Sequence, residues 1–172
     1  MRIRFLTVGG TIDKVYFDKL SQYEVGPPGV ERILRDLPVA FEYEIQSLLR
    51  KDSLDMTDDD RRLVVEAVRQ SPERLIVITH GTDTMIQTAR LLVGIPDRRI
   101  VLTGAMQPAN FHNTDAIFNI GQAVGVLMSR AEDGVFLAMS GRVFDPFRVR
   151  KNREQGIFED LDAISPNSAR NL

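Results

Sequence analysis

Residues 3–13 read Ile-Arg-Phe-Leu-Thr-Val-Gly-Gly-Thr-Ile-Asp, and this stretch decides the fold that we expect. Residues 3–8 are mostly aliphatic or β-branched, which is typical of a strand buried on both faces of a parallel sheet. The two glycines then let the backbone turn sharply and come close to a ligand. Thr11 is therefore expected at the rim of the sheet, either as a hydroxyl cap of the turn or as a functional group.

Similar segments recur along the chain and alternate with helical patterns. Residues 75–79, 100–103 and 135–139 also read as buried strands, and residues 41–48 alternate more, as expected of a strand nearer an edge. Helical patterns cover residues 29–37, 57–70, 82–92 and 114–129. Thr57 with Asp60, or Asp58 with Arg61 and Arg62 following, fits an N-cap with an acidic first turn. This alternation predicts an α/β domain with three layers and a doubly wound, mostly parallel sheet.

The composition fits one globular domain that binds neither nucleic acid nor a membrane. Of the 172 residues 43% are hydrophobic and 27% charged, and the formal net charge is −2 without a basic block. No apolar run reaches the roughly 20 residues that span a bilayer, and we expect no signal peptide. Because there is no cysteine, disulfides and thiolate chemistry are excluded, and we expect a cytoplasmic protein.

Two segments lack a regular pattern. Residues 13–28 hold two tyrosines and run into Gly-Pro-Pro-Gly, which predicts a long mobile loop. Residues 161–172 are polar and predict a loosely held tail after a domain of residues 1–160.

A second hydroxyl-rich turn follows the strand at residues 75–79. It reads His-Gly-Thr-Asp-Thr-Met at 80–85, and a helix is expected to begin at Thr82. Thr82 and Asp83 then serve either as helix caps or as ligand-binding groups beside Thr11. His80 and His112 lack the spacing of metal ligands, so we expect no metal site and no cofactor.

Taken together, these turns resemble the two signature motifs of the bacterial-type L-asparaginase family, Gly-Gly-Thr-Ile and His-Gly-Thr-Asp-Thr-Met. Further segments resemble that family's sequence: residues 103–108, Asp115 with Asn119, and residues 145–152. The resemblance runs from residue 3 to about residue 158. It implies the asparaginase N-terminal fold without the family's second domain.

The resemblance also implies roles for individual residues. Thr11 matches the nucleophile, and Tyr23 matches the tyrosine of a loop that closes near it. Thr82, Asp83 and Lys151 match a second group, in which the lysine acts on a threonine hydroxyl and the aspartate supports the lysine.

Other matched residues would hold the substrate. Ser53 and Asp83 match residues that bind the amino and carboxylate groups, and the Ala105 carbonyl matches the group that binds the leaving amide. Gly10, Asp52 and Gly81 would complete the substrate site.

The implied reaction is hydrolysis of L-asparagine to L-aspartate and ammonia through an acyl-enzyme, with weak glutamine hydrolysis. A threonine hydroxyl needs a neighbouring base, and a lysine can serve when its surroundings lower its pKa from about 10.4. Two alternatives remain open: an amidohydrolase or ammonia-generating partner that acts on another small amide, and a non-catalytic module that binds asparagine or aspartate.

Three features depart from the family's pattern or extend it. Asp13 replaces a small residue and would either repel an anionic substrate or assist proton movement. Leu54 replaces a glutamine, which removes a polar contact to the substrate. Phe144 and Phe147 lie among arginines in residues 142–150, a mixture common at interfaces, so we expect a dimer or tetramer.

Overall fold

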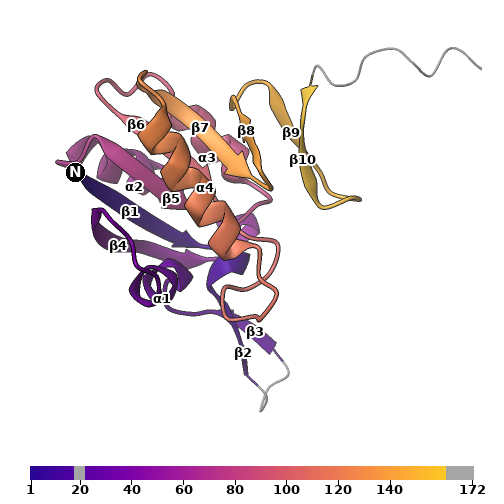
Figure 1. The fold of residues 1–172 in the computed structure, drawn as a ribbon. Coiled ribbons are helices and arrows are strands. Elements are labelled where there is room, and N and C mark those ends of the chain that lie inside the picture. Colours follow the sequence, from indigo (N-terminus) through magenta and orange to yellow (C-terminus); the bar gives the residue numbers. More distant parts are fainter. Residues whose placement is uncertain (18–21, 162–172) are drawn as a thin grey trace, which may run out of the picture.

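A six-stranded sheet forms the centre of the domain. The computed structural model describes residues 1–17 and 22–161, and its main sheet has the order β4-β1-β5-β6-β7-β8 (Figure 1). The strands are β4 (Glu42–Lys51), β1 (Arg2–Gly9), β5 (Leu75–Thr79), β6 (Arg99–Thr103), β7 (Gly134–Met139) and β8 (Arg142–Phe144). All pairs are parallel except β7 with β8. The mostly parallel sheet is confirmed, and β4 lies at its edge as residues 41–48 indicated.

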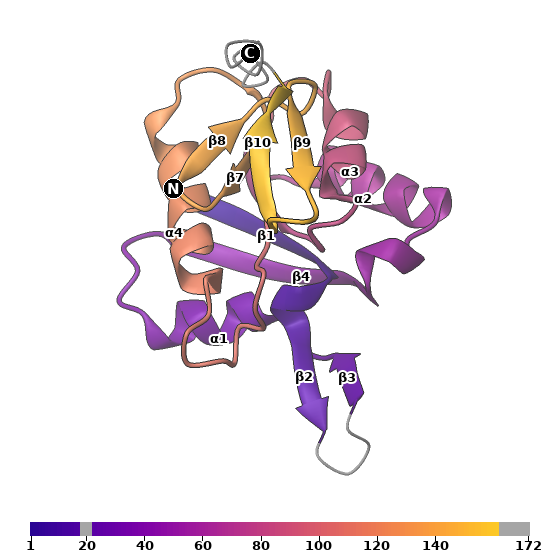
Figure 2. The ribbon, with the colours of Figure 1, turned by 90° about the vertical axis from the view of Figure 1, so that its right-hand side faces the viewer.

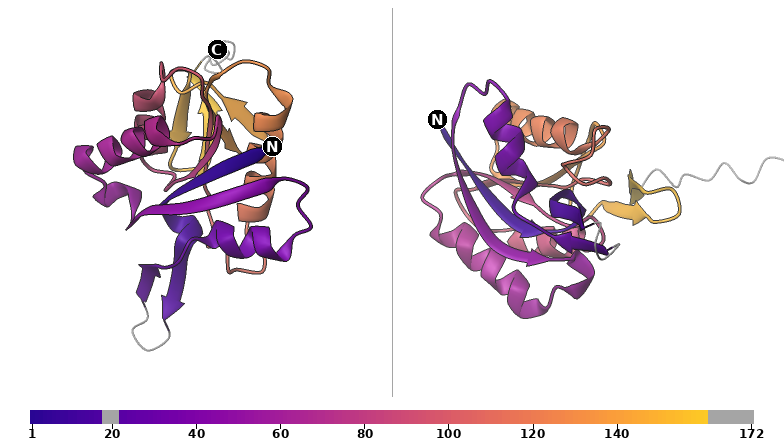
Figure 3. Two further views of the ribbon diagram at one scale, coloured as in Figure 1. Left: turned by 90° about the vertical axis from the view of Figure 1, so that its left-hand side faces the viewer. Right: turned by 90° about the horizontal axis from the view of Figure 1, so that it is seen from below.

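Helices cover both faces of the sheet, so the domain has three layers (Figure 3). The helices α2 (Asp58–Gln70) and α3 (Met85–Leu92) pack on one face, and α1 (Gly29–Asp36) and α4 (Ala116–Ser129) pack on the other. Alternate residues of β5 divide between the two cores: Ile76 and Ile78 face α2 and α3, whereas Val77 faces α1 and α4.

The helix starts follow the sequence in one case and depart from it in another. At α2, Thr57 and Asp60 form the capping box, in which each side chain accepts the other residue's amide. The third helix was expected from residue 82 but begins at Met85, and its N-cap Thr84 makes no side-chain capping bond. Thr82 and Asp83 therefore belong to the turn before α3 and do not cap it.

Two hairpins were missed by the sequence analysis (Figure 2). The segment predicted as a long loop contains β2 (Lys14–Phe17) paired with β3 (Gln22–Val25), and the pair projects from the domain. A second antiparallel pair, β9 (Val149–Asn152) and β10 (Ile157–Asp160), follows the sheet. The prediction of a loose tail concerns residues that lie, apart from residue 161, outside the described part of the chain.

None of the helices formed by residues 1–17 and 22–161 combines the length and the apolar character that crossing a bilayer requires.

Candidate active site

The carboxyl ends of β1 and β5 mark the point where the connections of the sheet diverge. After β1 the chain passes through α1 on one face to β4, and after β5 it passes through α3 on the other face to β6. Open α/β sheets bind ligands in the crevice outside the strands at such a point. Thr11 and Thr82 follow these two strands closely, so the fold brings both predicted residues to this edge.

Three turns pack against one another at this edge through glycines. Gly10 has φ +91°, and a Cβ atom there would lie 2.3 Å from the Cα of Gly81. A Cβ atom on Gly81 would in turn lie 2.6 Å from the hydroxyl oxygen of Ser53. Because only hydrogen fits at both positions, Gly10, Gly81 and Ser53 are held in direct contact. Thr11 and Thr82 each follow one of the two glycines directly, so the Gly10–Gly81 contact lies between these two threonines in the backbone.

A lysine from the distant β9 strand completes the cluster around Thr82. The Nζ atom of Lys151 donates to the Thr82 hydroxyl at 2.8 Å and to the Asp83 carboxylate at 2.8 Å. The side chain of Lys151 is only 13% exposed, whereas that of Asp83 is 30% exposed. Arg153 adds a second cation, with its Nε atom 3.6 Å from the same Asp83 oxygen. The side chains of Thr82 and Asp83 are therefore held by Lys151 and Arg153. They do not form the helix-capping bonds that were considered for them from the sequence.

The Thr11 hydroxyl is not used in the local structure. Thr11 begins a short 3-10 helix, Thr11–Asp13, and its side chain is partly exposed. Within the described residues this hydroxyl makes no hydrogen bond, and the N-cap position of the 3-10 helix is occupied by Gly10. The capping role considered for Thr11 is therefore not what the structure shows, and the hydroxyl is free to react or to bind.

Ser53 and Asp52 form the third turn of the site. The Ser53 side chain is 1% exposed, and its hydroxyl has no hydrogen-bond partner among the described residues. Asp52 accepts the Leu54 amide at 3.1 Å and pairs with Lys14 at 2.7 Å. Partial burial raises the pKa of the Asp52 carboxyl, but the bonds from Lys14 and Leu54 outweigh it and leave this pKa below its ordinary value. Asp52 is therefore a carboxylate at neutral pH.

His80 has a structural function that the sequence analysis did not assign. It is fully buried, with Nδ1 2.9 Å from the Gly81 carbonyl and Nε2 2.7 Å from the Thr88 hydroxyl. Because a carbonyl only accepts, Nδ1 carries the proton and Nε2 accepts from Thr88. Burial lowers the pKa of His80 to about 4, so the ring is neutral. It anchors the turn that carries Thr82.

The turn that carries Ala105 is held by two residues of the fourth helical segment. Asp115 accepts the backbone amides of Met106 and Gln107 at 2.9 to 3.0 Å. Asn119 is fully buried and donates to both the Gly104 carbonyl and Asp115. The sequence indicates the Asp115–Asn119 pair only through the family resemblance, and in the structure the pair holds the turn that carries Ala105.

Tyr23 lies among aromatic side chains. Its ring lies on the β2–β3 hairpin beside Tyr16, with ring centroids 5.3 Å apart, and 6.4 Å from the ring of Phe111. The residue is 51% exposed. The described part of the chain therefore shows Tyr23 on the projecting hairpin, with no hydrogen bond to the Thr11 hydroxyl.

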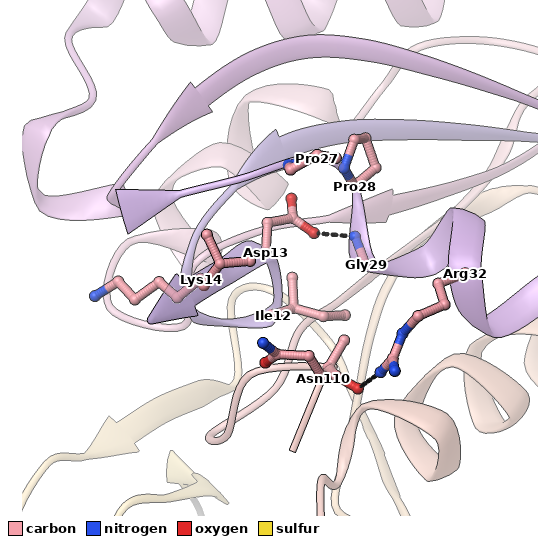
Figure 4. Close-up of a pocket in the computed structure, with 10 residues that line it drawn as sticks. Ile12, Asp13, Lys14, Pro27, Pro28, Gly29, Arg32 and Asn110 are labelled. Atoms are coloured by element: carbon pink, nitrogen blue, oxygen red, sulfur yellow. Dashed lines mark hydrogen bonds between the residues drawn. The ribbon is translucent and has the colours of Figure 1, made fainter. Parts of the chain in front are cut away.

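The two departures from the family pattern have different surroundings. Leu54 is 64% exposed beside Ser53. Asp13 is 3% exposed and accepts the Gly29 amide at 2.7 Å, at the start of α1 (Figure 4). It lines a cavity of about 190 Å³ beside Pro28, and burial raises the pKa of its carboxyl to about 6. The hydrogen-bond partner of its side chain is thus the start of α1, and the two roles considered for Asp13 toward the substrate stay predictions.

The fold is that of a doubly wound α/β domain, and hydroxyl, lysine and carboxylate groups gather at its switch point, where sheets of this kind bind ligands. The chain belongs to the asparaginase family: the family described as "Asparaginase, N-terminal" matches residues 2–167.

Individual relatives agree with this assignment. The chain is 31% identical over 162 residues to L-asparaginase 2 of Escherichia coli (strain K12), which covers 87% of this chain and 46% of that protein. It is 30% identical over 135 residues to L-asparaginase 2 of Bacillus subtilis (strain 168), covering 72% of this chain and 36% of the relative. The chain thus spans less than half the length of these two relatives.

Solved structures show the same fold. The thermostable L-asparaginase from Thermococcus kodakarensis superposes with a TM-score of 0.79 at 24% identity, covering 93% of this chain and 51% of that one. A probable cytoplasmic L-asparaginase from Campylobacter jejuni gives a TM-score of 0.78 at 24% identity, covering 92% of this chain and 51% of the other.

Proposed function

We propose that the protein hydrolyses L-asparagine to L-aspartate and ammonia, with Thr11 as the nucleophile. The observation that supports this proposal is the contact between Gly10 and Gly81, which packs the turn that carries Thr11 against the turn in which Thr82 pairs with Lys151. Family membership supports the reaction class, since the relatives compared above are named L-asparaginases.

The proposed reaction has two halves. The Thr11 oxygen bonds to the amide carbon, the C–N bond breaks, and the threonine proton leaves with ammonia. Water then bonds to the ester carbon, the bond to Thr11 breaks, and a proton returns to the threonine as aspartate departs. Backbone N–H donors near Thr11 or Thr82 would be needed to stabilise the oxyanion that forms in each half. The Gly10 amide is already donated to the Lys51 carbonyl at 2.9 Å.

Lys151 and Asp83 supply the proton chemistry in this proposal. Lys151 exchanges a proton with the Thr82 hydroxyl. Asp83 accepts a hydrogen bond from the Lys151 ammonium group and thereby orients it, while the Asp83 side chain stays partly exposed to water. Closure of the β2–β3 hairpin over bound substrate would bring Tyr23 toward Thr11. Lids of this kind exclude water and complete a catalytic group after the substrate binds.

Substrate recognition is proposed to use the unpaired Ser53 hydroxyl, the Asp83 carboxylate and the Ala105 carbonyl. A buried hydroxyl without a partner costs free energy that a bound substrate group recovers. Asp52, Gly10 and Gly81 hold these groups in position. Leu54 offers no polar contact, so discrimination between asparagine and glutamine is expected to be weak.

Ammonia release tests the proposal directly. Wild-type protein and Thr11→Ala are compared on asparagine, glutamine and a panel of small amides. Release from asparagine that Thr11→Ala abolishes supports the proposal, and wild-type turnover in Thr11→Ala overturns it. Release only from another amide assigns a different substrate, and saturable asparagine binding in calorimetry without release assigns a binding module.

We also infer that the protein forms a dimer or tetramer. Phe147 is 56% exposed, and the guanidinium carbon of Arg90 lies 5.6 Å from the centroid of the Phe147 ring. Aromatic and arginine side chains in combination are enriched at interfaces. Light scattering on the purified protein measures the mass, and a monomer at micromolar concentration overturns this inference.

A further inference from the structure

Lys14 joins two parts of the site that the sequence places far apart. It is the first residue of β2, and its Nζ atom lies 2.7 Å from the Asp52 carboxylate. The two side chains are 27% and 29% exposed, so the pair is partly shielded from water. It ties the hairpin that carries Tyr23 to the turn that carries Ser53.

Asp52 transmits this tie to Ser53. One carboxylate oxygen of Asp52 forms the ion pair with Lys14. The other oxygen accepts a hydrogen bond from the Leu54 amide at 3.1 Å, which caps the short 3-10 helix Ser53–Asp55. The carbonyl of Ser53 accepts from the Thr84 hydroxyl at 2.8 Å on the opposite side of the turn. The orientation of the unpaired Ser53 hydroxyl therefore depends on both anchors.

Two backbone hydrogen bonds hold the base of the hairpin. The Asp13 amide donates to the Gly10 carbonyl at 3.1 Å, and the Gly26 amide donates to the Asp13 carbonyl at 2.7 Å. Both ends of the hairpin are thus held at one residue, directly before Lys14. A partly exposed ion pair contributes little to the stability of a fold, so the consequence of Lys14–Asp52 lies in position.

We propose that Lys14 is a positioning residue for the substrate turn. It holds Asp52, and through Asp52 it holds Ser53 in the orientation that binds substrate. This inference rests on the proposed amide hydrolysis at the same site. We expect the Lys14–Asp52 pair to affect substrate affinity more than the chemical step, because neither residue forms a hydrogen bond with Thr11 or Lys151 among the described residues. The charge of Lys151 does act on Asp52, where it helps to lower the pKa of the carboxyl.

The test compares Lys14→Met, Lys14→Arg and Asp52→Asn with wild type. We expect KM for asparagine to rise about tenfold in Lys14→Met with kcat nearly unchanged, the pattern of lost uniform binding. Lys14→Arg retains a cation and restores KM. The double variant Lys14→Met/Asp52→Asn is no worse than Asp52→Asn alone, because the two residues act as one unit.

Arg74→Met is the matched control. It removes a cation from another ion pair, with Asp133 at 2.7 Å, at the opposite end of the sheet. Its KM is expected to equal that of wild type. A Lys14→Met variant with the KM of Arg74→Met overturns the proposal.

A second measurement keeps the test independent of catalysis. Hydrogen exchange of the Leu54 amide reports directly on the turn, because that amide donates to Asp52. It is expected to be faster in Lys14→Met than in wild type and Arg74→Met, and unchanged exchange overturns the role of Lys14. If the wild type releases no ammonia, the proposed function fails, and the Leu54 exchange still decides whether Lys14 holds the turn.

Discussion

The Nζ atom of Lys151 lies 2.8 Å from the Thr82 hydroxyl although 69 residues separate the two in the sequence. The β9–β10 hairpin makes this contact possible, since it follows the sheet and returns to the carboxyl end of β5. Within β9, neighbouring side chains point to opposite sides, and Arg150 pairs instead with Glu159. The hairpin thus directs the Lys151 ammonium group to the site, whereas the guanidinium of the preceding residue, Arg150, pairs with the partner strand β10.

Replacement of Lys151 by methionine is predicted to abolish most activity without unfolding the protein. The loss of a proton-transfer group costs about 10²- to 10⁴-fold in turnover. The matched variant Arg150→Met removes a cation one residue away and is expected to retain turnover. Single-turnover ammonia release measures the effect, with thermal unfolding as the check on folding. Equal turnover in the two variants would contradict the role of Lys151.

Gly81→Ala is predicted to disturb the contact between the three turns. The new Cβ atom would lie 2.6 Å from the Cβ and hydroxyl of Ser53, so the turns must separate. We expect a loss of about 1–3 kcal/mol in the free energy of unfolding, and about 10²-fold in turnover from the misplaced groups.

Gly121→Ala is the control for this change. Gly121 lies within α4, and a Cβ atom there meets nothing within 4 Å. Alanine in a helix interior is expected to stabilise the protein by about 0.5–1 kcal/mol. Urea unfolding of both variants compares the two, and a Gly81→Ala variant as stable and active as Gly121→Ala would show that the turns are not in tight contact.

The sequence predicted the sheet and its layers well because those elements are specified locally. Buried strands such as β5 are continuous aliphatic runs, and the Thr57–Asp60 capping box fixes the start of α2 within a few residues. Local pattern also placed Thr11 and Thr82 at one edge, since strands that run parallel end on the same side.

Features that depend on distant contacts were not predictable in the same way. Thr82 and Asp83 have the chemistry of helix caps, yet α3 begins after them, and Lys151 from a distant strand engages both side chains. The β2–β3 hairpin has strands of only four residues, too short for a clear alternating pattern. Burial of Asp13 follows from the position of α1, which its own neighbours in the sequence do not reveal.

Thr88→Val is predicted to destabilise the protein through His80. The change removes the hydroxyl that donates to Nε2 and leaves a fully buried nitrogen without a partner. The expected cost is about 1–3 kcal/mol in the free energy of unfolding. Thr79→Val is the control, because its hydroxyl is buried without a hydrogen bond. Its stability should equal or exceed that of wild type in urea unfolding, and equal losses in both variants would contradict the assigned bond.

Asp13→Asn is predicted to stabilise the protein above pH 6. Burial raises the pKa of the Asp13 carboxyl from 3.8 to about 6, against the opposing effects of the Gly29 amide and Arg50. Between these pH values the folded chain binds a proton that the unfolded chain does not. The contribution of the Asp13 carboxyl to the free energy of unfolding therefore falls as pH rises from about 4 to 6. Above that range the full cost of burying the charged carboxylate applies. Asparagine cannot ionise and still accepts the Gly29 amide.

The expected difference is about 1–3 kcal/mol in favour of Asp13→Asn at pH 8, and it should vanish near pH 4. His80 titrates in the opposite sense, because its pKa is lowered from 6.5 to about 4 and protonation of the folded chain is resisted as pH falls. In wild type the two contributions offset each other between pH 6 and 4. Asp13→Asn removes one of them, so its stability should fall more steeply with acid.

Asp36→Asn, at an exposed carboxyl, is the control. Urea unfolding at pH 4, 6 and 8 measures all three proteins, and a difference between Asp13→Asn and wild type that is independent of pH would show that the Asp13 carboxyl is not held in a buried, proton-binding state.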